Sequence, residues 1–332
     1  MQKMTTSDVN VNALNFYRRN LLQRAKALIV HDMWADVKPL PKGSGTYQTF
    51  MRVGNLANAP QLAEGVPPSG KKASVNEFRC SLVQFGDFLT FTDKLKMTAP
   101  DARLVEFTDL LGDQAGETLD IFHRDQMQAG TQVRYAGDVA DRSSVTTAPS
   151  KEDCQAISRI LDGNKTKLIK RQMNAGTGIG TEPVAAAYIG LTHTDCRQDW
   201  EDLAGFVPVH KYSTSKGVLE GEIGFYPPMR ARIIATTQAK VVRGVGAALG
   251  VTGLVSEGAA NIDVYCTIFF GAHFYGSMPL QKGGVDNIVK QLGNAGFDPL
   301  NQFGTSGWKA FTGGTILNDN FGVRYEHGAT DL

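Results

Sequence analysis

The first place to look for chemistry in this sequence is a pair of glycine-rich stretches. The better candidate for nucleotide binding is RGVGAALG, residues 243–250, which follows a strand-like segment and precedes an acidic residue, Asp263. Glycines after a strand, a helix behind them and a later carboxylate form the dinucleotide-binding fingerprint. Gly253 and Gly258 interrupt the segment where the crossover helix would begin, so a mobile glycine-rich loop is the preferred interpretation.

The second stretch is GTGIGT, residues 176–181. It follows a helical pattern instead of a strand, and it lacks the Gly-Lys-Ser/Thr ending of a phosphate-binding loop. We therefore do not expect it to bind phosphate.

A short cluster of possible metal ligands occurs in THTDC, where His193, Asp195 and Cys196 stand close together. No second HxxxH or CxxC pair supports a metal site, so a turn with a capping aspartate is the more ordinary interpretation. The other histidines are scattered, and the sequence has no GxSxG elbow or persuasive carboxylate pair. We expect no enzyme, no cofactor and no bound metal.

Composition sets the class of protein. The 332 residues are 42% hydrophobic, enough for one large domain or two ordinary ones, and the net charge is only +1. A nearly neutral chain gives no electrostatic basis for tight binding of nucleic acid. No secretory signal or apolar run long enough to span a membrane is present. The four cysteines are far apart and form no CxxC pair, which favours reduced thiols over disulfides or zinc.

An extended arm is predicted over residues 39–95. Its returning strand is SVNEFRCSLVQFGDFLTFTDKL, residues 74–95, and apolar and polar side chains alternate in the part SLVQFGDFLTFTDKL, residues 81–95. Asp87 and Phe88 interrupt the alternation and predict a bulge or a change of environment. An isolated two-stranded ribbon is only marginally stable, so such an arm needs another surface to lie on. A hairpin folded back on its own domain is the alternative.

A long helix is predicted over residues 98–130, with Thr98 and Pro100 in its N-cap and first turn. One apolar stripe recurs at steps of three and four and comprises Leu104, Phe107, Leu111, Ala115, Leu119 and Phe122. Gly112 and Gly116 predict close packing against a neighbour or a mild bend. The length is typical of a structural spine.

Helices and strands are mixed along the rest of the chain. Helices are predicted over residues 9–30, where the polar side is basic, and over 151–174. Buried strands are predicted to end near Leu191 and to cover 264–276, with a helix beginning near Asp195. The absence of regular βαβ alternation favours an α+β fold over a doubly wound sheet.

Four segments, in this order, resemble a known family. They are LVQFGDFLTFTDKL, LLGDQAGETLDIFHRDQMQAGTQVRYAG, YIGLTHTDCRQDWEDL, and FVPVHKY followed by GEIGFYPPMRARIIATT. Together they are similar to the major capsid proteins of N4-like tailed bacteriophages, over residues 40–240. The sequence departs from the family at YPPMRAR, where a compact glycine-containing turn is usual, and in its C-terminal third.

The resemblance implies the tailed-phage major capsid fold. Its implied parts are an N-terminal arm or helix (1–38), an extended β-hairpin loop lying across a neighbouring subunit (39–97), a peripheral domain with the spine helix (98–184), an axial domain (185–262), and return strands with a C-terminal tail (263–332). Contacts between subunits are implied at the loop tip, at Glu64, Gly65, Val66, Pro67, Pro68, Lys71 and Lys72.

The function that the resemblance implies is assembly. Copies would form hexamers and pentamers of an icosahedral virion shell, assembled in the host cytoplasm around double-stranded DNA that is not read by sequence. Because the chain begins close to the fold, a separate scaffolding protein is expected, together with a portal and a possible decoration protein. Two alternatives stay open: the shell of an encapsulin-like nanocompartment, and a nucleotide-binding enzyme that uses the RGVGAALG loop.

Overall fold

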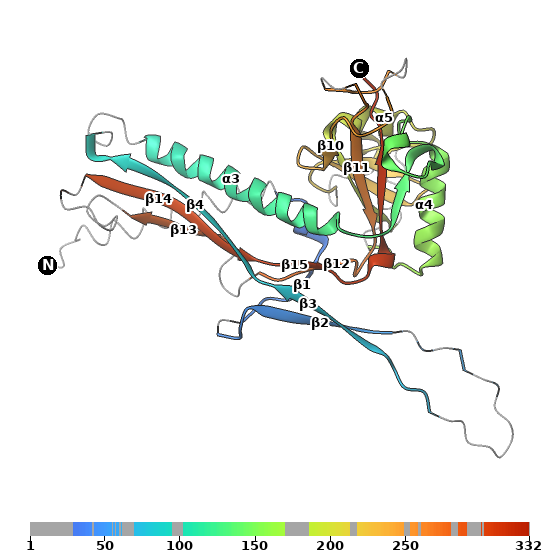
Figure 1. Ribbon diagram of the computed structural model, residues 1–332, viewed down its shortest axis with the longest axis horizontal. Coiled ribbons are helices and arrows are strands. Elements are labelled where there is room, and N and C mark those ends of the chain that lie inside the picture. Colours follow the sequence, from blue (N-terminus) through green and yellow to red (C-terminus); the bar gives the residue numbers. More distant parts are fainter. Residues whose placement is uncertain are drawn as a thin grey trace.

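The computed structural model describes residues 29–41, 43–54, 56, 58–59, 61, 70–94, 102–169, 186–212, 218–248, 253–257, 260–279, 285–290, 300 and 302–331, with only the backbone at 102–105. Figure 1 shows a compact lobe, an elongated lobe and a hairpin that projects from their junction. The predicted helix over 9–30 (apart from its last two residues), the GTGIGT stretch and the predicted N-cap at Thr98 lie outside the described residues.

The compact lobe is built on an eight-stranded sheet in the order β5-β16-β11-β6-β9-β8-β7, with β10 also paired to β11. Its strands are β5 (Val133–Tyr135), β6 (Tyr188–His193), β7 (Val207–Pro208), β8 (Glu222–Tyr226), β9 (Ala231–Thr236), β10 (Val241–Val242), β11 (Val264–Phe270) and β16 (Gly322–His327). Both faces of the central strands are buried, since every residue of β11 is below one tenth exposed. Because both faces are buried, β6 and β11 contain runs of apolar residues and no regular alternation with polar ones.

Two helices cover this sheet. α4 (Lys151–Gly163) begins at Ser150, whose hydroxyl accepts a hydrogen bond from the Asp153 backbone N–H at 3.2 Å. α5 (Arg197–Glu201) buries Trp200 in the main core beside α4. The predicted helix over 151–174 is too long, because the chain leaves α4 at Gly163 and the described residues beyond it turn toward an isolated bridge between Ile169 and Ala187.

The elongated lobe consists of one long helix on a three-stranded sheet. α3 (Ala102–Met127) lies along β13 (Val285–Lys290), β14 (Phe303–Thr312) and β4 (Val83–Thr92), as Figure 1 shows. Its 26 residues correspond to about 39 Å. The predicted stripe is confirmed at Leu111, Ala115 and Leu119, which form a buried core with residues of β13 and β14.

The predicted arm is divided in the structure. β3 (Val75–Ser81) pairs with β2 (Tyr47–Val53), whereas β4 pairs residue for residue with β14. The predicted bulge at Asp87 and Phe88 is therefore absent from this pairing. The Asp87 carboxylate instead accepts a hydrogen bond from Gln114 on α3 at 2.7 Å, and Gln114 also accepts one from the Trp308 indole N–H at 3.1 Å. Only the first half of the predicted returning strand belongs to the hairpin.

A small sheet joins the parts of the molecule. It consists of β1 (Asp36–Val37), β12 (Tyr275–Ser277) and β15 (Gly314–Ile316), and it is preceded by the 3-10 turn η1 (His31–Trp34). Asp120 on α3 holds η1, because its carboxylate accepts hydrogen bonds from the backbone N–H groups of Val30 and His31, both at 2.8 Å. The remaining 3-10 turns are η2 (Ala136–Asp138), η3 (Arg142–Ser144), η4 (Thr194–Cys196), η5 (Val209–Lys211) and η6 (Asp319–Phe321).

The chain passes between the lobes more often than a linear division suggests. β5 and α4 come from the segment 98–184, yet β5 pairs with β16 and α4 packs in the core of the compact lobe. β16 comes from the segment 263–332 and pairs with β11. The compact lobe is thus assembled from three of the predicted segments, and the domain names stay predictions.

A chain of buried hydrogen bonds crosses three strands of the compact lobe. The Trp200 indole N–H donates to the Thr192 hydroxyl at 3.1 Å. The Thr192 hydroxyl lies 2.9 Å from the Thr267 hydroxyl, which in turn lies 2.8 Å from His327 Nε2. His327 Nδ1 lies 2.7 Å from the Gly328 carbonyl, so this nitrogen carries the proton and Nε2 accepts from Thr267. Complete burial lowers the pKa of His327 to about 4, which keeps the ring neutral.

The four cysteines are free and buried. Burial raises the pKa of the Cys80 thiol to about 11 and that of Cys154 to about 12. No described helix combines the length and the apolar character needed to cross a membrane.

Candidate assembly interface

The hairpin of β2 and β3 has two faces of different character. Residues on alternate positions share a face, and the pairing places Tyr47 opposite Ser81 and Val53 opposite Val75. The inner face carries Phe50 and Cys80, both buried in a small cluster with Leu40, Met278 and Leu317. This cluster anchors the base of the hairpin to the rest of the chain.

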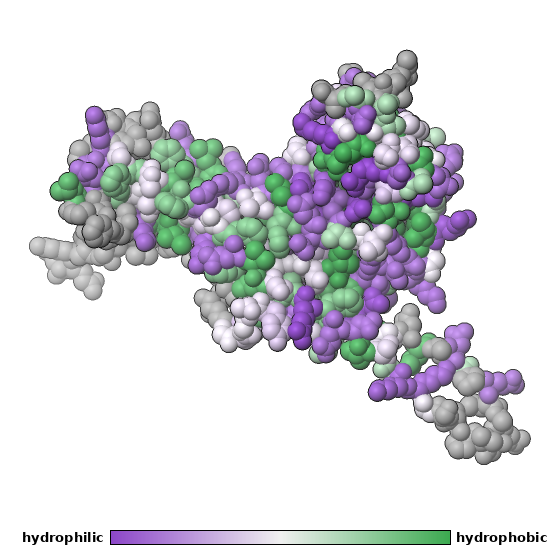
Figure 2. All heavy atoms as spheres, in the orientation of Figure 1, coloured by the Kyte–Doolittle hydropathy of each residue, from purple (hydrophilic) through white to green (hydrophobic). Residues whose placement is uncertain are grey.

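The outer face of the hairpin is uncovered and carries four exposed apolar side chains, with the exposed Glu77 and Arg79 on the same face. Tyr47, Met51, Val53 and Val75 are 52%, 68%, 64% and 54% exposed. Figure 2 shows apolar patches among hydrophilic ones along the projecting hairpin and over the elongated lobe. Strand pairing leaves both edges of the hairpin free among the described strands, because β2 and β3 form a sheet of their own. An apolar face next to free edges is a surface for another protein to cover.

Only two of the seven predicted tip residues, Lys71 and Lys72, are among the described residues. Glu64, Gly65, Val66, Pro67 and Pro68 lie outside the described residues. Lys71 and Lys72 are exposed where the chain returns toward β3, and the Lys71 ammonium donates to the Asn58 carbonyl across the hairpin. The outer face was not predicted, although TYQTFMRVG, residues 46–54, carries apolar side chains on both of its alternating sets.

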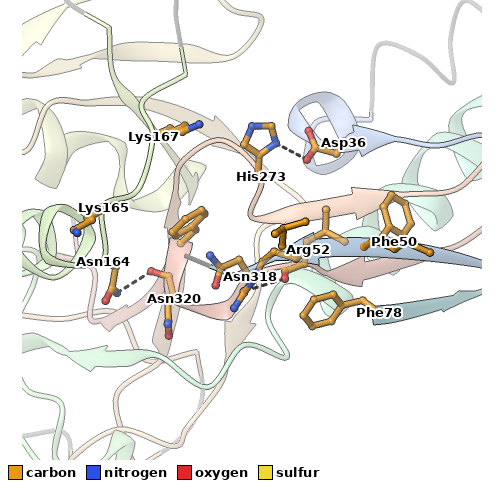
Figure 3. Close-up of a pocket in the computed structure, with 15 residues that line it drawn as sticks. Asp36, Phe50, Arg52, Phe78, Asn164, Lys165, Lys167, His273, Asn318 and Asn320 are labelled. Carbon is orange, nitrogen blue, oxygen red and sulfur yellow. Dashed lines mark hydrogen bonds and ion pairs between the residues drawn. The ribbon is translucent and has the colours of Figure 1, made fainter. Parts of the chain in front are cut away.

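A cleft of about 630 Å³ opens between the hairpin base and the compact lobe (Figure 3). The side chains that decide its character are Phe50, Arg52, Phe78, Lys165, Lys167 and His273. Arg52 stacks over the Phe78 ring at 5.8 Å, and His273 pairs with Asp36 at 2.7 Å. Asn164 donates to the Asn320 carbonyl at 2.8 Å and ties the end of α4 to η6 at the far wall. The cleft has aromatic walls and a cationic rim.

The described part of the RGVGAALG stretch, residues 243–248, is packed as part of the fold. Asp263 is buried, and its carboxylate accepts hydrogen bonds from the backbone N–H groups of Gly244 (2.7 Å) and Glu257 (3.1 Å). A side chain at Gly246 would approach the Ile262 carbonyl to 2.9 Å. The carboxylate that would hold a ribose in a dinucleotide site therefore holds the loop itself, and the described residues after the loop form no helix.

The THTDC cluster is a turn between β6 and α5. His193 caps it by accepting the Asp195 N–H at 3.2 Å, so the predicted capping aspartate is replaced by a histidine. Tyr265 donates to Asp195 at 2.9 Å, and Cys196 is buried with its pKa raised by desolvation. In the described part of the chain no three metal-binding side chains gather at one point.

Solved structures with the same arrangement of elements are phage capsid structures. The chain is similar to the capsid of Ralstonia phage GP4, with a TM-score of 0.65 and 13% identity. It is also similar to the capsid structures of the cyanophage P-SCSP1u (0.59, 12%) and the Helicobacter pylori bacteriophage KHP30 (0.56, 11%). Each match covers 91% of this chain and 89% of the other. The chain has the tailed-phage major capsid fold.

The predicted α+β capsid fold is thus confirmed. No family model matches the sequence, and no curated protein does. At 11–13% identity the likeness concerns the fold, and the individual contacts of this capsid-fold chain have to be argued from its own residues.

Proposed function

We propose that this chain is a major capsid protein whose copies assemble as hexamers and pentamers into an icosahedral shell around double-stranded DNA. The observation that carries the proposal is the capsid fold, which matches over 91% of this chain and 89% of its neighbours. The uncovered apolar face of the hairpin supports it, because a projecting ribbon of this kind is stabilised when another copy covers it.

Assembly through the hairpin follows from general interface physics. The hairpin of one copy meets a different surface of the next, which makes the contact heterologous, and heterologous contacts close into rings when the rotation between copies allows it. A standard interface buries about 800 Å² on each partner. Contacts of this size, repeated around every ring, make the shell far more stable than one pair of copies.

The finer assignments belong to the same proposal. The chain would belong with the N4-like phage capsid proteins that its sequence pattern resembles, and its copies would meet at the loop tip, at Glu64, Gly65, Val66, Pro67, Pro68, Lys71 and Lys72. A separate scaffolding protein, a portal and a possible decoration protein would take part in the host cytoplasm, and the product would be the virion shell. The net charge of +1 supports enclosure of DNA without sequence-specific binding.

The test is electron microscopy with analytical ultracentrifugation of the chain, alone and with a candidate scaffolding protein. We expect closed shells or ring-shaped capsomers. Met51→Lys should reduce the assembled fraction at least about tenfold, because the lysine would carry a charge into an interface that an apolar side chain fits, and pairing with Glu77 opposite it on β3 would not remove the cost of desolvating that charge. Met51→Leu, which keeps the apolar character, should assemble as wild type does.

Two results would contradict the proposal. A monomer or dimer with and without the scaffolding protein would show that the chain does not form shells. Equal assembly of the Met51→Lys and wild-type chains would remove the hairpin face from the interface. Particles from the source cells that hold protein cargo and no nucleic acid would instead favour the nanocompartment.

A further inference from the structure

The cleft at the hairpin base has cations that no described carboxylate neutralises. Lys165 and Lys167 are exposed on its rim, and in the described ranges neither ammonium group pairs with a carboxylate. Arg52 contributes a third positive charge, and its guanidinium donates one hydrogen bond to the Leu317 carbonyl at 3.4 Å. Asp36, which also lines the cleft, lies 2.7 Å from the His273 ring nitrogen, and the three cations outnumber this one carboxylate. The cleft therefore favours a negatively charged occupant.

The backbone is strained at two of the residues that line this cleft. Lys165 (φ 56) and His273 (φ 64) are in the left-handed region, which non-glycine residues rarely adopt. Lys165 stands just past the end of α4, where its N–H donates to the Asp162 carbonyl and the next N–H donates to Leu161. Glycine is the usual residue at this position. A lysine there costs stability and places a cation on the cleft rim, which points to a role for the side chain.

A matching surface exists on α3 of the same chain. Glu106, Leu110 and Glu117 follow one another at helical spacing, so their side chains project within about 40° of one another around the helix. Leu110 is 61% exposed, and both glutamates are exposed. Across the residues that the structure describes, neither glutamate carboxylate meets a cation. This face has an apolar centre with a carboxylate on each side.

We propose that the α3 face of a second copy docks at the cleft, with Leu110 against the aromatic walls and the two glutamates beside Lys165 and Lys167. The inference rests on the proposed assembly function and names the surfaces that meet. The α3 face of one copy has an apolar centre flanked by carboxylates, and the cleft of the other copy has aromatic walls beside cations. Apolar groups facing apolar groups, with opposite charges around them, are typical of a specific interface. Because the two surfaces differ, the contact is heterologous and propagates from copy to copy.

A charge exchange tests the contact. Lys165→Glu with Lys167→Glu should lower the assembled fraction at least about tenfold, and Glu106→Lys with Glu117→Lys should do the same, because like charges would then face each other. All four changes in one chain should bring assembly back to within about threefold of wild type, since the pairs are opposite again. Circular dichroism of each variant checks that it is folded.

Lys165→Gly removes both the charge and the backbone strain at this position, and the two losses should have opposite effects. This variant should have a higher denaturation midpoint than wild type, because glycine relieves the left-handed conformation, and yet assemble less well. The proposed contact would be contradicted if the charge reversals leave assembly unchanged. It would also be contradicted if the variant with all four substitutions assembles as poorly as the variants with two.

The contact can be tested even without shells. A wild-type chain that never assembles contradicts the proposed function. Mixing a Lys167→Cys chain with a Glu117→Cys chain under oxidation still reports on the docking, because a disulfide-linked heterodimer should form about tenfold faster than from a Glu117→Cys chain mixed with a chain carrying Glu220→Cys. Equal rates would overturn the docking independently of assembly.

Discussion

Replacing Arg232 by methionine is expected to lower the free energy of unfolding by about 3–5 kcal/mol. Arg232 on β9 is buried and binds both oxygens of Glu222 on β8, at 2.7 and 2.5 Å. The Tyr212 hydroxyl and the Leu219 N–H also donate to this carboxylate, at 2.8 and 2.9 Å. Without the guanidinium, a buried carboxylate would keep only neutral donors, which do not compensate for its lost hydration.

The measurement is urea denaturation of the unassembled chain, followed by circular dichroism. The matched control is the double variant Arg232→Met with Glu222→Gln, in which the amide oxygen still accepts the Leu219 N–H and no charge is stranded. We expect it to regain at least half of the loss. A double variant as unstable as the single one would mean that packing, and not the buried charge, causes the effect.

Acidification from pH 7 to pH 5 is expected to cost about 2 kcal/mol of stability through His327. Its pKa is lowered to about 4 in the folded chain, whereas the ordinary pKa of a histidine side chain is about 6.5. Between these values the unfolded state binds a proton that the folded state does not, so stability falls as the pH falls. Protonation would also turn Nε2 into a donor facing the Thr267 hydroxyl, so the hydrogen bond between Thr192 and Thr267 would have to reverse, while the Trp200 indole N–H can only donate. Burial lowers the pKa of His123 as well, which acts in the same direction.

The pH profile of the urea midpoint checks this expectation. His327→Gln can donate and accept in the same two places without titrating, so its stability should change about 2 kcal/mol less than that of wild type between pH 7 and pH 5. Parallel profiles for the two chains would show that His327 is not the group that responds.

The sequence predicts those parts of the fold whose signal is local. α3 was predictable because Leu111, Ala115 and Leu119 recur at helical spacing, and the buried strand β11 because VYCTIFF is continuously apolar. The division of the arm was not predictable, since β4 is held by β14, a strand from the other end of the chain. A pattern of alternating residues shows that a segment is a strand but not which partner it has.

The candidate site was predictable only in outline. The need for a partner surface followed from the length of the ribbon, but the cleft is lined by Arg52, Lys165 and His273, which are far apart in the sequence. Lys165 is distinguished by its positive φ, which only the structure shows. In the sequence it is a lysine just after a helix and cannot be told from an ordinary exposed cation.

The division at Leu82 has a mechanical consequence. β3 and β4 are separated by this one residue, and Gly313 packs so closely against the end of β3 that a side chain there would approach the Ser81 carbonyl to 2.5 Å. The seven-residue strand beyond this point extends over about 23 Å. A twist of about 10° in the sheet under α3 would therefore move the far end of β3 by about 4 Å. Because the base of the hairpin continues into the sheet of the elongated lobe, a small change in the twist of that sheet would produce a large displacement at the far end of the hairpin.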